Sequence, residues 1–218
     1  MGQTRFEEGA ATWDDQPARV LMGKAIAAGI LEQVPLEKTM TVVDFGCGTG
    51  LVTLALLPYV RSITGIDNSV NMLEQLRMKC AARQITNVKA IHLNLEVDSP
   101  PDEKADAIVS AMAFHHVADL PRVVRSLVGM LVPGGFLAIA DLDAEDGSFH
   151  ENMDGVHHAG FERAWLKDQM RLLGLGDLKD RMAYVVERQK PEGPRHYPVF
   201  LVSGKKLSIL PDSESDHE

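Results

Sequence analysis

The sequence predicts a three-layer α/β sandwich, with helices on both faces of a mainly parallel sheet, and three observations support this fold class. From residue 41 onward, short apolar runs alternate with amphipathic segments of helical period, which is typical of strands joined by crossover helices. A glycine-rich stretch follows the first apolar run directly. The 218 residues suffice for one well-packed core and are too few for two comfortable domains.

The elements of the first two thirds follow from periodicity and from turn residues. Residues 17–36 predict a helix, which Pro35 ends. Strands are expected at residues 41–45, 62–66, 88–93, 105–111 and 136–141. Helices are expected at residues 51–57, at 70–82 with Ser69 or Asn68 as the cap, and at 120–131 with Asp119 as the cap. Pro133-Gly134-Gly135 predicts the turn into the fifth strand.

The pattern is looser after the fifth strand. Residues 142–156 are polar and predict a loop, and residues 161–173 predict a helix that Gly174 ends. Strands at 182–187 and 199–202, joined by the polar stretch 188–198, predict a hairpin. The acidic tail 211–218 is expected to be disordered.

Charge and composition narrow the possible partners and the compartment. The formal net charge is −9, and the basic residues are scattered, with Lys205-Lys206 as the densest cluster, so we expect no nucleic-acid partner. No apolar run approaches the roughly 20 residues of a membrane span and no signal peptide is recognisable, which predicts a cytoplasmic protein without membrane contact. Cys47 and Cys80 lack zinc or disulfide spacing, so we expect reduced thiols.

The glycine stretch and an aspartate one strand later predict a nucleoside site. Gly46, Gly48 and Gly50 allow a sharp turn and let a ligand lie against the backbone. Asp67 ends the next apolar run, where a carboxylate can accept hydrogen bonds from both hydroxyls of a ribose. A tight turn or a helix-capping aspartate would explain either feature alone. Both together indicate an adenosine-containing cofactor.

Two such cofactors, NAD and S-adenosylmethionine, have to be told apart. A dinucleotide fingerprint requires a third glycine where this chain has Leu51, and Gly50 comes one position early. The three tyrosines, Tyr59, Tyr184 and Tyr197, form no Tyr-x-x-x-Lys pair. These features disfavour an NAD-dependent oxidoreductase without deciding the matter. A non-catalytic nucleoside-binding protein also stays open.

The segment 42–50, VVDFGCGTG, resembles the first motif of class I S-adenosylmethionine-dependent methyltransferases. ITGIDNS around Asp67, ADAIVSAMAFHHV at 105–117 and LVPGGFLAIA at 131–140 are similar to further motifs of that family, in the same order. The resemblance covers residues 6–205. It implies a Rossmann-like, mostly parallel seven-stranded sheet with one antiparallel strand near the C-terminus. It also implies that S-adenosylmethionine is converted to S-adenosylhomocysteine as a small molecule is methylated.

The resemblance assigns roles to particular residues. The implied cofactor-binding residues are Trp13, Asp44, Gly46, Gly48, Asp67, Asn68, Asn94, Leu95, Ala111 and Met112. Asp67 would hold the ribose, and Gly46 and Gly48 would meet the methionine part. Asn94 departs from the family pattern, which often has Asp there, but its amide oxygen can still accept a hydrogen bond from adenine. Trp13 would either form part of a lid or pack onto the flank of the sheet.

The implied division of the chain has a helical cap at 1–40, a cofactor-binding half at 41–141 and a substrate-side part with the hairpin at 142–205. The resemblance leaves open whether the protein acts as a monomer or a homodimer. Ser110–His115 (SAMAFH) lacks the Asn/Asp-Pro-Pro-Tyr motif of family members that methylate amino groups of proteins or nucleic acids, which favours a small acceptor.

In-line methyl transfer needs a general base only when the nucleophile arrives protonated, so a catalytic residue is not required. His115, His116 and His157 are the candidates for such a base, and a structural role is equally consistent with their positions. The histidines and acids of the segment 141–158 show no recognised ligand spacing, so no metal site is predicted.

Overall fold

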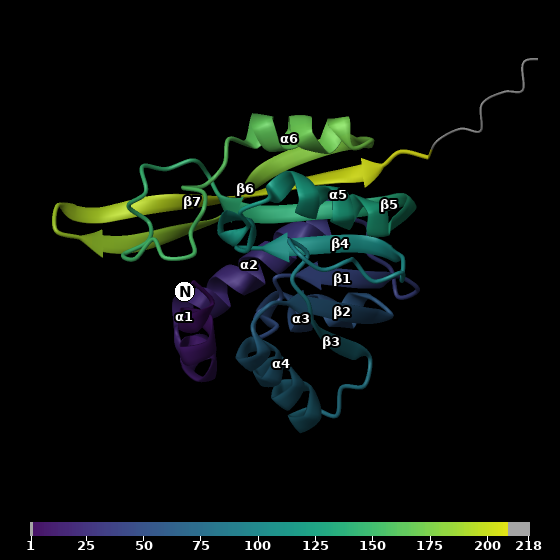
Figure 1. Ribbon diagram of the computed structural model, residues 1–218, viewed down its shortest axis with the longest axis horizontal. Helices are drawn as coiled ribbons and strands as arrows, with labels where there is room; N and C mark the ends of the chain where they lie inside the picture. The colour runs from purple at the N-terminus through teal and green to yellow at the C-terminus, as the bar shows by residue number, and fades with distance from the viewer. Residues whose placement is uncertain (1, 209–218) are drawn as a thin grey trace, which may run out of the picture.

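A seven-stranded sheet forms the centre of the protein in a computed structural model, which describes residues 2–208 (Figure 1). The strand order is β3-β2-β1-β4-β5-β7-β6, and the predicted tail 211–218 lies outside the described residues. The strands are β1 (Thr41–Phe45), β2 (Ser62–Asp67), β3 (Val88–His92), β4 (Ala105–Ala111), β5 (Leu131–Leu142), β6 (Leu175–Lys190) and β7 (Gly193–Lys206). The first five are parallel and β7 is antiparallel to both of its neighbours, which confirms the predicted fold class.

Helices cover both faces of this sheet. Neighbouring strand residues point to opposite faces, so Val42 packs with α2 and α3, whereas Val43 packs with α5 and α6. The helix α4 lies on the α3 side, because Gly65 of β2 faces Leu76. These helices are α2 (Pro17–Gln33), α3 (Leu51–Leu56), α4 (Val70–Ala82), α5 (Leu120–Met130) and α6 (Arg163–Leu172). Among the described residues, no helix has the length and apolar character of a membrane span.

Two helix caps predicted from the sequence are confirmed. The Ser69 hydroxyl accepts a hydrogen bond of 3.2 Å from the backbone N–H of Met72, so Ser69 rather than Asn68 caps α4. The Asp119 carboxylate accepts one of 3.1 Å from the backbone N–H of Arg122 at the start of α5. The first capped helix follows β2 directly, which fixes the carboxyl end of that strand.

The C-terminal hairpin is much longer than the sequence predicts. The stretch 188–198, expected as a connection, is almost entirely strand, since Arg188 pairs with Arg195 and only Pro191 and Glu192 form the turn. The sheet itself ends at the pair Leu142–Val199. Residues 184–198, here called the hairpin arm, extend past the carboxyl ends of the other strands (Figure 1). Within the described residues, the two strands of the arm pair only with each other and with no third strand. The arm therefore needs few apolar side chains, and its polar sequence resembles that of a loop.

Smaller differences concern element boundaries. The strand β5 begins at Leu131, so Pro133-Gly134-Gly135 is an irregular strand entry, with a shift of register opposite Ala105 and Ala107, and not a separate turn. The helix expected at 161–173 begins at Arg163. The remaining short elements are α1 (Gly2–Gly9), η1 (Ala10–Asp15), η2 (Leu57–Tyr59) and η3 (Phe114–His116).

The contribution of the α5 face to stability can be measured with two leucines. Leu127 lies on α5 and is fully buried against the sheet, and Leu172 at the end of α6 is 80% exposed. We expect Leu127→Ala to lower the free energy of unfolding by about 2–5 kcal/mol and Leu172→Ala to change it by less than about 0.5 kcal/mol. Urea denaturation monitored by circular dichroism measures both. Equal losses in the two variants would contradict this packing.

Candidate functional site

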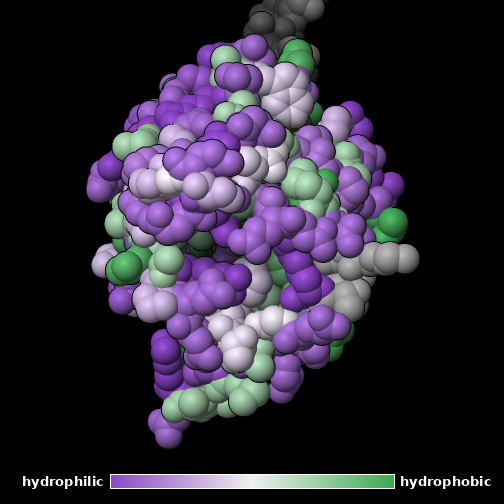
Figure 2. All heavy atoms as spheres, turned by 90° about the vertical axis from the view of Figure 1, so that its left-hand side faces the viewer, coloured by the Kyte–Doolittle hydropathy of each residue, from purple (hydrophilic) through white to green (hydrophobic). Residues whose placement is uncertain are grey.

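A cavity of about 690 Å³ lies at the carboxyl ends of the parallel strands. Its floor comes from the segments that follow β1, β2, β3 and β4, and its walls include the N-terminal residues and the hairpin arm. Seen from the side of α1 and the hairpin arm, the surface is mostly hydrophilic and is hollowed near its centre (Figure 2). Ligands of open α/β sheets bind in this position, and the volume is typical of a small-molecule site.

The glycine loop after β1 supplies one side of the cavity. Gly46 has a φ of +68°, and a Cβ on it would lie 2.3 Å from the Cβ of Ala113. Gly48 has a φ of +53°, and a Cβ on it would meet no atom within 4 Å. Gly46 thus allows the loop to pack against the end of β4, whereas Gly48 leaves open space on the side of the cavity.

The Asp67 carboxylate holds this loop against the end of β2. Its Oδ2 accepts a hydrogen bond of 2.8 Å from the backbone N–H of Gly48, and its Oδ1 accepts one of 2.8 Å from the backbone N–H of Ser69. Burial raises the pKa of Asp67, and the backbone hydrogen bonds oppose this rise. Each carboxylate oxygen can accept a further hydrogen bond, so a pair of neighbouring hydroxyls in the cavity fits this group.

Asp44 supports the loop from below. The Thr53 hydroxyl of α3 donates a hydrogen bond of 2.5 Å to its Oδ2, and the aspartate is almost fully buried. The pKa of Asp44 is raised to about 7, mainly by burial and to a lesser degree by the nearby charge of Asp67, while the hydrogen bonds with Thr53 oppose this rise.

All ten predicted cofactor-binding residues line this one cavity: Trp13, Asp44, Gly46, Gly48, Asp67, Asn68, Asn94, Leu95, Ala111 and Met112. The Asn94 amide oxygen already accepts a hydrogen bond of 3.0 Å from the backbone N–H of Glu96. Met112 has a φ of +56°, unusual for a residue with a side chain, and its N–H donates to the Ala140 carbonyl (2.8 Å) at the end of β5.

The N-terminal segment is fastened over the cofactor side of the cavity. The Glu7 carboxylate accepts hydrogen bonds of 2.9 Å from the backbone N–H groups of Val70 and Asn71 at the start of α4. The Asp14 carboxylate accepts hydrogen bonds of 2.6 Å from the Thr49 hydroxyl and from Lys79. The cap thus bonds directly to the glycine loop and to the first turn of α4.

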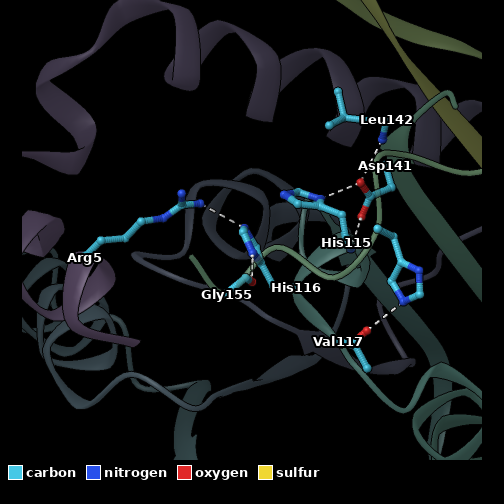
Figure 3. A network of polar contacts seen from close by, with 8 residues as sticks. Arg5, His115, His116, Val117, Asp141, Leu142 and Gly155 are labelled. Carbon is cyan, nitrogen blue, oxygen red and sulfur yellow. Dashed lines mark hydrogen bonds and ion pairs between the residues drawn. The ribbon is translucent and has the colours of Figure 1, made fainter. Parts of the chain in front are cut away.

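The three histidine candidates have different surroundings. His115 Nδ1 lies 2.6 Å from Asp141 Oδ1, and both side chains are buried at the cavity edge (Figure 3). A carboxylate only accepts, so His115 Nδ1 donates this hydrogen bond. His157 is exposed and does not line the cavity, and its backbone N–H donates to the His115 carbonyl. The structure therefore gives His157 no position from which to act as a base there.

His116 is fixed through both ring nitrogens. Its Nδ1 lies 2.7 Å from the Gly155 carbonyl oxygen and must donate, so its Nε2 accepts from the Arg5 guanidinium at 3.2 Å (Figure 3). Burial lowers its pKa to about 2, and His115 and Arg5 add to this effect. His116 is thus a neutral residue that positions Arg5, and no electron pair on it is left for a substrate proton.

The arginines Arg5, Arg19 and Arg188 also line the cavity and were not predicted to, whereas His150, which lines it too, belongs to the histidine-rich segment that the sequence analysis considered. Arg5 comes from a segment with no periodic pattern, Arg19 comes from the predicted helix 17–36, and Arg188 lies in the stretch expected as a connection. Only the fold brings them together. Among residues 2–208, no group of three or more His, Cys, Asp or Glu side chains is arranged to hold a metal ion.

Comparison with known proteins agrees with this geometry. Residues 42–135 match the model of a family described as a methyltransferase domain. An uncharacterized methyltransferase of Schizosaccharomyces pombe is 36% identical over 56% of this chain and 48% of its own length. The trans-aconitate 2-methyltransferase of Rhodopseudomonas palustris is 31% identical over 64% of this chain and 52% of its own length. The chain thus spans about half the length of these curated relatives.

A solved structure shares the fold at lower identity. The phosphoethanolamine N-methyltransferase 2 of Haemonchus contortus, in complex with S-adenosyl-L-methionine, superposes with a TM-score of 0.68 at 13% identity. The match covers 93% of this chain and 60% of that one.

The raised pKa of Asp44 predicts a pH-dependent stability. In the ligand-free protein the folded state keeps this proton up to about pH 7, whereas the unfolded chain loses it near the ordinary value of 3.8. Stability should therefore fall as the pH rises through this window, by up to about 1.4 kcal/mol per pH unit. Asp44→Asn removes the titration and can still accept the hydrogen bond from Thr53. Urea denaturation between about pH 4 and pH 7 should show wild type losing stability relative to the variant, and parallel profiles would refute the assignment.

Proposed function

We propose that the chain is a class I S-adenosylmethionine-dependent methyltransferase and that it transfers the methyl group of S-adenosylmethionine to a small molecule. One observation carries the proposal. The Asp67 carboxylate lies against the Gly48 amide at the floor of the cavity, where the glycine loop leaves room for a ligand.

The residues present fit an adenosine-containing cofactor. Asp67 offers acceptors for both ribose hydroxyls, and Leu95 and Met72 provide apolar surface near Asn68 for the adenine. The open side of Gly48 and the end of β4 at Ala111 leave space for the methionine part. The site contains no third glycine for a pyrophosphate, since Leu51 occupies that position.

When bound, S-adenosylmethionine supplies a sulfonium methyl group that a nucleophile takes in a single in-line displacement. The chain's own part is to align the acceptor and to keep water away from the site. Glu7 and Asp14 hold the N-terminal cap over the cavity, and Ser148 and Tyr197, joined at 2.9 Å, hold the segment after β5 against the hairpin arm. Alignment of this kind contributes on the order of 7–11 kcal/mol to a displacement.

The size of the cavity and the character of relatives support a small acceptor. A cavity of about 690 Å³ that also holds the cofactor leaves room for a small molecule only. Several relatives are named for trans-aconitate, a small organic acid. The absence of a nucleic-acid partner and the oligomeric state, monomer or homodimer, stay predictions.

Calorimetric titration tests the cofactor site. We expect wild type to bind S-adenosylmethionine and S-adenosylhomocysteine, and Asp67→Ala to bind each more weakly by about 1–3 kcal/mol, because charge-assisted hydrogen bonds to the ribose are lost. Asp102→Ala removes an exposed carboxylate from the loop before β4 and should bind like wild type. Wild type should not bind NADH.

Thermal melts of the three proteins establish that each is folded before titration. The proposal fails if wild type binds neither nucleoside, or if Asp67→Ala binds them as tightly as the Asp102→Ala control does.

A further inference from the structure

Two arginines border the cavity without a countercharge. Arg5 comes from α1 and Arg188 from the hairpin arm. Within residues 2–208 neither side chain forms an ion pair. The Arg5 guanidinium bonds to His116 and lies 4.8 Å above the Phe6 ring, and the Arg188 guanidinium lies 4.2 Å above the Phe149 ring. Both side chains are only partly buried, so water covers part of each guanidinium, but no carboxylate of the described residues neutralises either charge.

The buried nitrogen atoms next to this charge also lack partners. The Arg188 Nε has no access to solvent and no hydrogen-bond partner among the described residues, and the same is true of the His150 Nε2. The His150 ring packs 4.7 Å from Phe149, the ring that lies under Arg188. Both nitrogens belong to side chains that line the cavity, so a small side-chain rotation on ligand binding would let a ligand satisfy them.

The carboxylates nearest these arginines do not neutralise them. Glu187 also borders the cavity, but it is next to Arg188 on a strand, where side chains alternate between faces, and it pairs with His196 at 3.5 Å. Glu151 is exposed at the rim. The pKa of Arg5 is lowered by burial and then by repulsion from Arg188, with no carboxylate raising it. Two positive charges therefore face the same space.

A third guanidinium, Arg19, differs from these two. It lies 3.6 Å above the Trp13 ring and donates to the Trp13 carbonyl oxygen. Burial lowers the pKa of Arg19, repulsion from Arg188 and Arg5 lowers it further, and the charge of Asp14 opposes this shift. Arg19 comes from α2, beside Met22 and Gly23 on the glycine-loop side of the cavity. Arg19 therefore adds to the positive charge of the cavity, but it has a carboxylate nearby, whereas no carboxylate raises the pKa of Arg5.

We propose that the methyl acceptor is a small organic anion whose carboxylate or phosphate group binds to Arg5 and Arg188, with His150 hydrogen-bonded beside them. Guanidinium groups bind both kinds of oxyanion through paired hydrogen bonds. The assignment rests on the proposed function, since it names the substrate class of the same cavity. It also gives His116 a role as a positioning residue, because His116 accepts from Arg5 and holds its guanidinium in place.

The melting temperature of the complex with S-adenosylhomocysteine tests this directly. The probes are glutarate and citrate, glycerol 3-phosphate, and the neutral compounds glutaramide and glycerol, all at one ionic strength. We expect carboxylates or the phosphate to raise the melting temperature and the neutral compounds to leave it unchanged. Stabilisation by glutarate or citrate would indicate a carboxylate acceptor, and stabilisation by glycerol 3-phosphate would indicate a phosphate acceptor.

Arg5→Met and Arg188→Met keep the apolar stem and remove the charge. Each should weaken the affinity for the stabilising anion about 10- to 100-fold and leave the affinity for S-adenosylhomocysteine unchanged. Arg171→Met, on the exposed surface of α6, is the matched control and should behave like wild type.

The outcomes separate this inference from the function on which it rests. If no anion stabilises the wild-type complex, if the neutral compounds stabilise it equally, or if both arginine variants respond like Arg171→Met, the inference is overturned. Failure of wild type to bind S-adenosylhomocysteine overturns the proposed function instead. The wild-type measurements decide the matter even if one variant does not fold.

Discussion

The Asp67 carboxylate, partly buried at the end of β2, accepts a hydrogen bond of 2.8 Å from the backbone N–H of Gly48 and so ties two neighbouring strand ends together. Parallel pairing of β1 with β2 brings these groups to the same edge of the sheet, in a register that pairs Phe45 with Ile66. The burial that raises the pKa of this carboxylate also strengthens each hydrogen bond it makes. The shape of the glycine loop, and with it the floor of the cavity, depends on this contact.

The walls of the cavity come from parts of the chain that are distant in sequence. The N-terminal cap bonds to the glycine loop through Asp14. The hairpin arm, which extends past the ends of the other strands, contributes Arg188. The segment after β5 closes the gap, with Arg195 and Asp146 paired at 2.9 Å. The cofactor side is thus built on rigid strand ends, and the acceptor side is built on segments whose length and charge can vary without disturbing the sheet.

The sequence predicted the parallel sheet and the caps at Ser69 and Asp119, because those depend on local periodicity and on turns of a few residues. The ten residues that the resemblance implies for the cofactor all line one cavity, and their binding of the cofactor stays a prediction. The sequence did not predict the hairpin arm, since a two-stranded ribbon with polar side chains on both faces lacks the alternation that marks a half-buried strand. It also could not bring Arg5 and Arg188 to one cavity, because that depends on how distant segments pack. The role of His116 could not be predicted for the same reason. Its two ring nitrogens are hydrogen-bonded to Arg5 and Gly155, which are distant in sequence, and so it cannot act as a base.

A crystal structure with S-adenosylhomocysteine bound tests the central claim most directly. The account predicts that both ribose hydroxyls lie within about 2.6–3.2 Å of the Asp67 carboxylate oxygens and that the hydrogen bond from Gly48 to Asp67 is kept. A nucleoside bound elsewhere, or an Asp67 side chain turned away from the glycine loop in the complex, would contradict it.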